Sequence, residues 1–486
     1  MKHDILAQAL DEIRDAFLEE AARPKRKHRL PWVGAVAAVL ALCLTVGLIW
    51  GGRQSPAPPG AESSTDPSEQ EGLRIPSAGE PFLLAAPKYP AMVKFNGQNW
   101  SQWRESQKGQ YDQPRGYATT AKAFFRNSIP GVLTDSTQNQ TYSPVNAYMA
   151  LAMLAETADG SSRQQLLDLL GADSIGTLRT QAGHMWNAHY RDDGLGTSVL
   201  ANSLWLDDGL SYREDTVTTL ADSYYASVYR GDLGSSQMTE ALRSWLNEQT
   251  KGLLEEQAQQ LDFSERASLV LASTIYYNVE WMDAFAKEKN TEDTFHTPNG
   301  DRSVTYMHRV LHYGPYYQGE DFTAIALELK DDGRMWLILP QEDCTPADLL
   351  QSGHALELVL GQEEASQAED IRVNLSVPKF DVVSDTDLIP VLKTLGVTDI
   401  FEPDKADFSD LTDTPDEYPY ISQVQHAARV AIDEEGVLAA AFTVMERDAA
   451  AAEIPQEIDF VLNRPFFFCI ESKDGIPLFT GIVNEP

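Results

Sequence analysis

The chain has 486 residues, of which 43% are hydrophobic and 9% aromatic, so it can bury a large core and is not a disordered polymer. It carries 38 Lys and Arg against 73 Asp and Glu, a formal net charge of −35. So acidic a chain repels nucleic acid, anionic lipid and sulfated polysaccharide, which leaves proteins or cations as expected partners. Of the three cysteines, Cys43 lies in an apolar segment, so at most one disulfide can form, between Cys344 and Cys469.

The N-terminal region is predicted to cross a membrane once. Residues 1–30 place apolar side chains at helical spacing and should form a short amphipathic segment. Residues 31–52 carry no charge and contain VGAVAAVLALCLTVGLIW, which as a helix would measure about 27 Å, close to the hydrocarbon thickness of a bilayer. A cleaved signal peptide is the less favoured alternative, because no small-residue cleavage site follows Trp50.

Charge around this span predicts its orientation. The stretch RPKRKHR precedes the span, whereas only Arg53 follows it closely. By the positive-inside rule the N-terminus is cytoplasmic and the remainder extracellular, which predicts a single-pass protein of the cell membrane. Residues 53–87 are rich in Pro, Ser and Glu and are predicted to be an extended linker. The folded domain is expected over 88–486, where NWSQWRE indicates that residues 88–115 pack onto the main body.

From residue 117 onward helical and strand-like patterns alternate, without a repeat period or a second linker, which predicts one large body that mixes helices and strands. Helical patterns cover 119–128, 144–157, 162–170, 213–226, 236–249 and 386–395. Strand-like runs cover 198–206, 268–278, 303–312, 322–329, 334–339, 371–383, 427–433, 466–471 and 477–483.

Catalytic and metal-binding patterns are not found. The sequence has no H-E-x-x-H, G-x-S-x-G, Walker or G-x-G-x-x-G motif. The densest histidine group, His296, His308 and His312, lies on strand-like sequence, where packing is the simpler explanation than metal binding. Cys344 has acidic neighbours, which raise a thiol pKa and oppose nucleophilic chemistry. We therefore expect no catalytic residue, no metal site and no cofactor.

One stretch near the C-terminus combines the features of a loop and of a buried strand. In EEGVLAAAFTVM, residues 434–445, the run from Gly436 to Met445 carries no charge. It therefore lacks the polar face of a surface helix but suits a strand that is covered on both faces. Its flanks are strongly charged and are expected to be exposed loop.

The neighbours of this stretch identify a family. VQHAARVAIDEEGVLAAAFTV and the later FVLNRPFFFCIESKDGIPLFTGIVNEP resemble the hinge, reactive loop and C-terminal strands of the serpins. The match continues, in the family's order, through YSPVNAYMALAMLAETADGSSRQQLLDLLG, ANSLWL, LRSWLNEQTKG, LVLASTIYYNVEWMDAF, VPKFDV and LKTLGVTDIF. The resemblance covers 117–486 and implies the α+β serpin fold, with three β-sheets, about eight or nine helices and an exposed reactive-centre loop. With the transmembrane helix in front, the chain resembles a membrane-tethered, bacterial-type member.

In serpins the native fold is metastable, and the cleaved reactive loop inserts as a new central strand of the main sheet. By this resemblance the loop hinge comprises Glu434, Glu435, Gly436, Val437, Leu438, Ala439, Ala440, Ala441, Phe442 and Thr443. An inserted strand must be uncharged, free of proline and small, and this run meets all three conditions.

Alternation along that strand assigns its faces. Val437, Ala439, Ala441 and Thr443 should face the core, whereas the bulkier Phe442 should face outward. Members of the family that have lost inhibition often carry a charge or a proline at the Val437 position. The uncharged hinge therefore favours an inhibitor.

By the family's spacing, counting from Gly436 gives Ala450 and counting back from NRPF gives Ala451, so we expect the scissile bond between Ala450 and Ala451, and the alanine run 449–452 also allows a shift by one residue. The segment from the hinge to this bond, about fourteen residues, would extend roughly 46 Å as a strand, enough to carry an attached protease along the sheet. Alanine suits the shallow, apolar primary pocket of elastase-like or subtilisin-like proteases. Cleavage after Arg447 would shorten the inserted strand, so this residue is expected to be a substrate site at best.

The resemblance also implies residues that control how readily the sheet opens. The positions that match the family's polar cluster and buried tryptophan are Ser143, Asn146, His426 and Trp281. Asn146 replaces the family's usual serine, and Ser273 replaces its usual asparagine. A structural polar cluster and a core tryptophan are the simpler interpretations of the same residues.

The sequence thus predicts a monomeric, membrane-tethered suicide-substrate inhibitor whose partner is a serine protease, held in a covalent acyl-enzyme complex. The alternative is a non-inhibitory serpin-fold binding or sensing module, in which cleavage of the loop signals through the tether. The permissive hinge favours the inhibitor, and no residue constellation favours a hydrolase.

Overall fold

The computed structural model describes residues 81–261, 268–312, 316–361, 366–368, 371–413, 419–422, 424–437 and 456–486. The predicted cytoplasmic segment, transmembrane helix and most of the linker lie outside these residues, as does the loop from 438 to 455. No helix within the described ranges is long and apolar enough to cross a membrane. The membrane span at 31–52 therefore stays a prediction.

Three β-sheets build the body, which confirms the expectation from the resemblance. The largest, called sheet A here, has the strand order β1-β5-β4-β6-β16-β15-β14, with β3 paired to β4. Its strands are β1 Phe82–Ala85, β3 Arg191–Asp192, β4 Gly196–Asp207, β5 Ala226–Gly231, β6 Leu269–Glu280, β14 Phe380–Asp387, β15 Gln425–Ile432 and β16 Gly436–Val437. Every residue of β4 from 200 to 206 is buried, which explains its continuous run of apolar and small residues.

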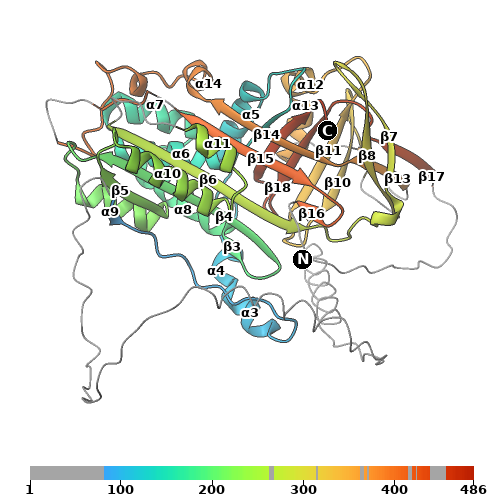
Figure 1. Cartoon of the computed structure of the whole chain (residues 1–486), viewed down its shortest axis with the longest axis horizontal. Helices are drawn as coiled ribbons and strands as arrows, with labels where there is room; N and C mark the ends of the chain where they lie inside the picture. The colour runs from blue at the N-terminus through green and yellow to red at the C-terminus, as the bar shows by residue number, and fades with distance from the viewer. Residues whose placement is uncertain are drawn as a thin grey trace, which may run out of the picture. The chain divides into compact units, whose positions relative to one another are not determined.

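The two other sheets lie beside sheet A (Figure 1). Sheet B has the order β12-β9-β10-β11-β18-β19-β2, and sheet C the order β17-β13-β8-β7. The strands of sheet B are β2 Gln140–Tyr142, β9 Tyr316–Gln318, β10 Phe322–Glu328, β11 Arg334–Pro340, β12 Ser366–Ala368, β18 Phe466–Glu471 and β19 Pro477–Val483; those of sheet C are β7 Thr291–Thr297, β8 Gly300–His312, β13 Ile371–Pro378 and β17 Gln456–Val461.

Residues 371–383, predicted as one strand, belong to two strands in different sheets. β13 ends at Pro378 in sheet C, and β14 begins at Phe380 in sheet A. Proline has no N–H for a ladder, so the chain can leave one sheet at Pro378 and enter the next. Lys379 lies at the corner, where its N–H donates to the Thr305 carbonyl oxygen at 2.9 Å.

Twelve α-helices occur within the described residues, so the expected eight or nine is too low. They are α3 Trp100–Ser106, α4 Lys108–Tyr111, α5 Ala121–Val132, α6 Pro144–Thr157, α7 Gly160–Leu170, α8 Ile175–His189, α9 Glu214–Ser223, α10 Ser236–Gln249, α11 Glu255–Gln260, α12 Pro346–Ser352, α13 His354–Val359 and α14 Ile389–Thr394. Six of them span seven residues or fewer. So short a helix shows too few turns for a periodic pattern to reveal it.

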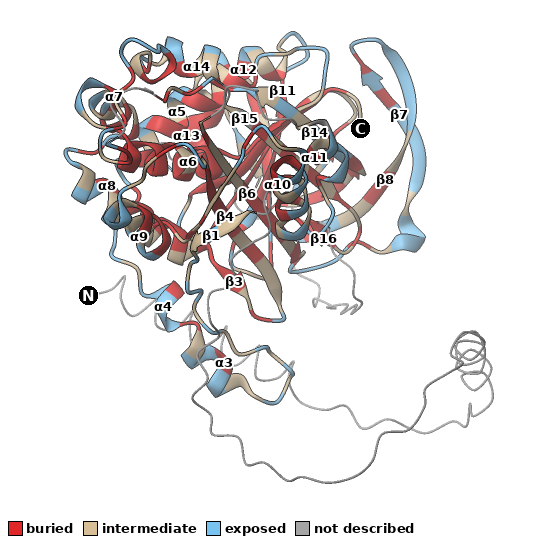
Figure 2. Cartoon of the chain, turned by 60° about the vertical axis from the view of Figure 1, so that its left-hand side comes forward, coloured by how far each residue is buried: buried red, intermediate tan, exposed pale blue. Residues whose placement is uncertain are grey.

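Helix α6 forms the centre of the core. All of its residues except Ala150 are buried, and it contacts β6 of sheet A and β19 of sheet B. Figure 2 shows this buried helix on one side of the strands of sheet A, with α10 and α11 on the other side. Its Ser143 cap accepts the Asn146 N–H at 3.4 Å, and Pro144 occupies the first turn, where a missing N–H costs nothing.

Sheet A begins inside the region predicted as linker. β1 lies within 53–87 and pairs antiparallel with β5, with Phe82 opposite Arg230 and Leu83 opposite Tyr229. Residues 76–486 form one compact unit. The segment before residue 88 is therefore part of the folded body from β1 onward.

Candidate functional site: the loop hinge and the sheet it enters

The predicted hinge begins as a short strand between two longer strands of sheet A (Figure 1). On one side Gly436 pairs with Glu280 and Val437 with Val279 of β6; on the other side Val437 pairs with Ile432 of β15. Strand β16 is thus the described element that links β6 to β15. The described part of the predicted hinge ends at Val437.

The turn before β16 is fixed by one carboxylate. Asp433 accepts hydrogen bonds from the N–H groups of Glu435 at 2.8 Å and Gly436 at 3.2 Å. Its own N–H donates to the Gly436 carbonyl oxygen at 3.1 Å. An Asx turn of this kind holds β15 and β16 as a hairpin, so the first hinge residues have a defined position.

Strand β16 is much shorter than its neighbours. Within the described residues it has two residues, whereas β6 has 12 and β15 has 8. In the described part of sheet A, β6 and β15 have no ladder with each other. Unpaired strand edges accept a further strand, so β6 and β15 can pair with a longer β16.

Close packing at the hinge requires a glycine. A Cβ on Gly436 would lie 2.4 Å from the Val279 carbonyl oxygen and 2.6 Å from Glu280 Cα. Only glycine allows the two backbones to approach this closely. The next side chain, Val437, is 2% exposed and faces the core, as the alternation predicts for this residue.

The other predicted loop residues lie outside the described part of the chain. These are the hinge residues Leu438, Ala439, Ala440, Ala441, Phe442 and Thr443 and the scissile residues Ala450 and Ala451. Their roles stay predictions.

Trp281 anchors the hinge hairpin. Its indole N–H donates to the Asp433 carbonyl oxygen at 2.9 Å, and its backbone N–H donates to the Glu435 carbonyl oxygen at 2.9 Å. Phe285 packs edge-to-face on the indole at 6.1 Å and donates its N–H to the Glu434 carbonyl oxygen at 2.8 Å. Trp281 therefore contacts the hinge hairpin, whereas the other three predicted sheet-opening residues form a separate group.

Glu434 is buried, which corrects the expectation that the charged flank of the hinge is exposed. Its side chain is 3% exposed and forms an ion pair with Lys379 Nζ at 2.5 Å. Asn290 Nδ2 donates to the same carboxylate at 2.5 Å. Burial alone would raise the pKa of Glu434, but the hydrogen bonds from Lys379 and Asn290 lower it. The sequence analysis missed both partners; the one available signal was a lone lysine within the apolar stretch VPKF.

Ser143 and His426 form the first half of the polar cluster beneath sheet A. The Ser143 N–H donates to His426 Nε2 at 3.0 Å, which joins α6 to β15. The Ser143 hydroxyl donates to the Leu478 carbonyl oxygen of β19 at 2.7 Å. Tyr142 packs edge-to-face against the His426 ring at 5.1 Å. The cluster therefore connects β15 to α6 and to sheet B.

Asn146 and Ser273 form the second half. Asn146 Nδ2 donates to the Ser273 carbonyl oxygen at 3.0 Å, and the Ser273 hydroxyl contacts Asn146 Oδ1. The same hydroxyl lies 2.7 Å from Asn202 Oδ1, and Asn202 Nδ2 donates to the Tyr224 carbonyl oxygen at 2.8 Å. The two positions at which the chain departs from the family's usual residues thus contact each other, with serine and asparagine exchanged.

This exchange predicts a non-additive pair of substitutions. Asn146→Ser should lose the hydrogen bond to β6 and leave a small cavity, and Ser273→Asn should overpack the cluster, each lowering the free energy of unfolding by about 1–2 kcal/mol. The double variant restores a serine–asparagine pair and should lie within about 1 kcal/mol of the parent. Urea unfolding of the four proteins measures the coupling. Losses that simply add would show that the two side chains do not act as a pair.

Protonation of His426 should destabilise the fold in acid. Burial lowers the pKa of His426 from 6.5 to about 4, and its Nε2 must be unprotonated to accept the Ser143 N–H. Between these values the unfolded chain binds a proton here that the folded chain does not, so stability falls as pH falls from 6.5 to 4. Above pH 6.5 the free energy of unfolding does not depend on His426. Near pH 4 the loss in that free energy approaches about 3 kcal/mol.

The control for His426 is a side chain that accepts a hydrogen bond without titrating. His426→Gln should lose less stability than the parent between about pH 7 and about pH 4.5 in urea unfolding. Other groups with shifted pKa values, including Glu471, titrate alike in both proteins and cancel from the difference. A difference between the two proteins that does not change with pH would contradict the assignment.

The described residues contain no group of three or more His, Cys, Asp and Glu side chains that could hold a metal ion. Two histidines of the densest group have other partners: His296 Nδ1 lies 2.8 Å from Asp301 Oδ1, and His308 lies 2.7 Å from Thr291 Oγ1 through Nε2 and 3.0 Å from Ser376 Oγ through Nδ1. Cys344 and Cys469 are both free thiols.

Comparison with known proteins places this hinge in a family. A family model described as serpin (serine protease inhibitor) matches residues 124–486. The chain is 27% identical over 388 residues to a serpin-like protein of Methanosarcina acetivorans, with 76% of this chain and 86% of the relative covered. It is 27% identical over 367 residues to plasminogen activator inhibitor 1 of Sus scrofa, with 72% and 87% covered.

Solved structures give the same result. The crystal structure of tengpin, a thermophilic serpin, in its native state matches with a TM-score of 0.67 at 25% identity and covers 82% of this chain and 97% of that chain. The three sheets, the short strand at the start of the reactive loop and the match over residues 124–486 together show that the chain belongs to the serpin family, whose members are in general protease inhibitors.

Proposed function

We propose that this serpin is a suicide-substrate inhibitor of serine proteases with small or aliphatic primary specificity, elastase-like or subtilisin-like. The position of β16 is the observation that supports the proposal most directly. Gly436 and Val437 already lie between β6 and β15, and the uncharged run begins at this point. Every further residue of that run can extend β16 without bringing a charge into the sheet.

The reaction uses the protease's own catalytic groups. Its serine attacks the carbonyl carbon of Ala450, the bond to Ala451 breaks, and the protease's histidine gives a proton to the new Ala451 amino group. Ala450 is then held as an ester on the serine. Extension of β16 drags the attached protease along sheet A and distorts its catalytic site before water hydrolyses the ester. Inhibition is thus a race between strand insertion and deacylation.

A membrane tether completes the proposal. With 31–52 as a transmembrane helix and the basic cluster RPKRKHR on the cytoplasmic side, the inhibitor would act outside the cell against proteases that approach its surface. Added protease should remove the serpin domain from intact cells by cutting the linker. Protection of that domain until the cells are lysed would refute this orientation.

Mixing the full-length chain with an elastase tests inhibition, with trypsin as the specificity control. We expect a covalent adduct that survives a denaturing gel, and a released peptide whose mass shows that it begins at Ala451. Complete loop cleavage with the elastase fully active would refute inhibition and favour the sensing module. An adduct with trypsin alone, and a peptide that begins at Asp448, would move the scissile bond to Arg447.

A further inference from the structure

Residues 81–117, called the N-terminal strap here, cross one end of sheet A. The strap begins with β1, the edge strand of sheet A, which pairs with β5; it continues through α3 and α4 and ends at Tyr117. It precedes the residues that the serpin family model matches, which start at 124. Figures 1 and 2 show α3 and α4 beside β3, at the same end of the body as β16.

The strap's first attachment is the hairpin of β3 and β4. The Phe95 N–H donates to the Asp193 carbonyl oxygen at 2.6 Å, and Lys94 forms an ion pair with Asp192. A Cβ on Gly194, whose φ is +88°, would lie 3.1 Å from Phe95 N, so the strap approaches this turn as closely as a glycine allows. The hairpin and the strap therefore hold each other in place.

An aromatic stack extends this attachment. The ring of Tyr89 stacks on Trp186 with 5.3 Å between ring centroids. Trp186 stacks in turn on Tyr190 at 4.7 Å and on Tyr225 at 3.5 Å. Tyr89 is 38% exposed and covers the fully buried Trp186, and stacked aromatic rings contribute more than their area alone. The strap is thus bound to α8 and to the start of β5.

The second attachment lies on sheet B. The Lys473 ammonium sits 3.9 Å from the centroid of the Tyr111 ring, and the Tyr117 hydroxyl donates to Asp474 at 3.2 Å. Both partners belong to the turn that joins β18 and β19. A cation over an aromatic face is attractive, and here it connects the strap to a different sheet.

The two attachments belong to halves of the molecule that insertion must separate. On one side, β1, β5 and β4 form continuous ladders with β6. On the other side, β19 pairs with β2, and the N–H groups of Thr141 and Ser143 bond to Ser384 of β14 and His426 of β15. A new strand between β6 and β15 moves these halves apart by about 4.8 Å.

The attachment to the first half lies next to the hinge. Gly196, at the start of β4, pairs with Val279 of β6. Val279 pairs on its other side with Val437. Only one strand therefore separates the hairpin that the strap grips from the point at which the loop enters. A constraint on the hairpin acts where sheet A has to open first.

We propose that the N-terminal strap is a clamp that bridges the two halves of the body at the loop-entry end and slows insertion of the reactive loop. The proposal rests on the inhibition proposed above, because it names a regulator of the same strand insertion. The clamp keeps the intact loop from inserting spontaneously, and it must yield or stretch when the cleaved loop inserts. The contacts between the strap and the rest of the chain thus set the energy barrier to loop insertion.

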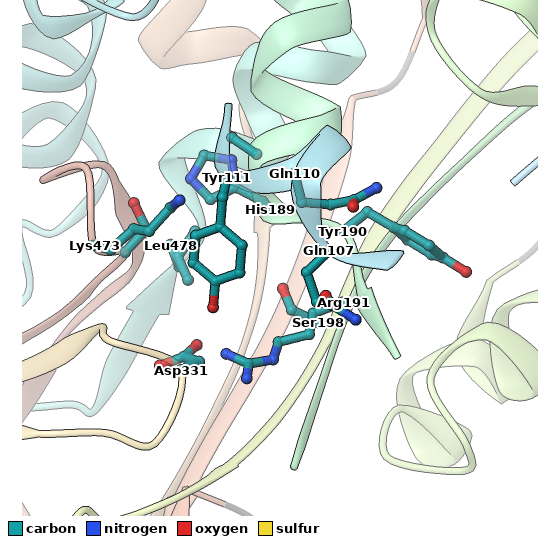
Figure 3. Close-up of a pocket in the computed structure, with 12 residues that line it drawn as sticks. Gln107, Gln110, Tyr111, His189, Tyr190, Arg191, Ser198, Asp331, Lys473 and Leu478 are labelled. Atoms are coloured by element: carbon teal, nitrogen blue, oxygen red, sulfur yellow. The ribbon is translucent and has the colours of Figure 1, made fainter. Parts of the chain in front are cut away.

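A polar cavity makes this clamp releasable. A cavity of about 40 Å³ lies between the strap and the body (Figure 3). Gln110 Oε1, His189 Nε2 and Ser198 Oγ are buried around it and have no hydrogen-bond partner among the described residues. Buried polar atoms of this kind bind water, and a water-filled joint separates more easily than a close-packed one.

A charge swap in the full-length chain tests the clamp without creating a cavity. Lys94→Glu and Asp192→Lys each break one exposed ion pair, whose side chains are 58% and 42% exposed. Each should speed conversion of the intact chain into its inserted form about threefold, and the double swap should restore the parent rate. Arg302→Glu is the matched control, because its pair with Glu485 has side chains 60% and 41% exposed and lies away from the strap.

A larger change tests the aromatic attachment. Tyr89→Ala should speed the same conversion about tenfold. Tyr316→Ala removes a partly buried tyrosine from β9 of sheet B, outside the strap, and should leave the rate unchanged. The protein is incubated, and samples are then placed in a urea concentration that unfolds freshly prepared protein. The fraction that stays folded measures conversion, because the inserted form is the more stable one.

The outcomes separate the clamp from the inhibitory function. If the parent traps elastase but all strap variants convert at the parent rate, the clamp is wrong and inhibition stands. If no adduct forms, yet nicking stabilises the chain and strap variants convert faster than their controls, inhibition is wrong and the clamp stands. If neither cleavage nor incubation ever yields a more stable form, both proposals are wrong.

Discussion

Replacing Val437 by arginine is expected to convert the protein from an inhibitor into a substrate. Val437 is 2% exposed and has a paired strand on each side. An arginine would move the hinge out of sheet A in the intact chain, and insertion would then have to return an unpaired charge to the position between β6 and β15, at a cost of several kcal/mol. Because about 1.4 kcal/mol is a tenfold change in rate, insertion should slow by about a hundredfold or more, and deacylation should then release the protease.

Gel densitometry of adduct and cleaved chain, at a fixed ratio of protease to serpin, measures this partition. Val437→Thr is the matched control, because it keeps the β-branched shape without adding a charge, and it should still form mostly adduct. An arginine variant that traps as much elastase as the parent would show that a charge at position 437 does not hinder extension of β16.

Reversing the charge of Glu434 is expected to destabilise the intact fold by about 3 kcal/mol. The Glu434 side chain is 3% exposed, and its partner Lys379 is 35% exposed. Loss of one member of a buried pair leaves the other charge uncompensated and typically costs about 3–5 kcal/mol; the low end applies because Lys379 retains some contact with solvent. Glu434→Lys also places two like charges together and removes the acceptor for Asn290.

Urea unfolding of Glu434→Lys, Lys379→Glu and the double variant tests this ion pair. The double variant restores opposite charges and should recover at least half of the loss. The neighbouring Glu435→Lys is the control: its pair with Lys287 has 3.8 Å between charged atoms and a lysine side chain that is 66% exposed, so it should cost less than about 1 kcal/mol. If Glu434→Lys and Glu435→Lys lowered the free energy of unfolding equally, the buried pair of Glu434 and Lys379 would contribute no more than the exposed one.

Long elements with strong patterns could be predicted from the sequence. The bounds predicted for α6, α10, β18 and β19 match the structure residue for residue. In α6 a serine cap and Pro144 mark the start of the helix, and β18 and β19 are apolar except for Glu471 and Thr480. Local rules decide such segments because nearly every residue agrees with the final environment.

Helix α8 and the hinge ion pair could not be predicted in this way. α8 carries Gly176, Thr177, Thr180 and Gly183 among its residues, which hides its apolar stripe, and its packing on sheet A decides its conformation. Glu434 is buried because Lys379 and Asn290, which are distant in sequence, come to the hinge in the folded chain. The lone lysine in VPKF indicated an unusual site but did not identify Glu434 as its partner.

In the candidate site too, local motifs could be predicted from the sequence, whereas contacts between distant residues could not. The resemblance to serpins located the hinge, Trp281 and the polar residues, because each has a recognisable local motif. It did not show that Asn146 and Ser273, 127 residues apart, contact each other, nor that Trp281 holds the hinge rather than the polar cluster. These relations depend on how β6 crosses α6 and passes β16, which is tertiary geometry.

The central claim is that the intact fold stores free energy that is released when the loop becomes a strand of sheet A. The most direct test compares the melting temperature of the intact chain with that of chain nicked once within residues 438–455. Each new backbone hydrogen bond contributes about 0.5–1.5 kcal/mol net, so insertion of some ten residues should raise the melting temperature by at least about 10 °C. A nicked chain that melts at or below the temperature of the intact chain would contradict the account.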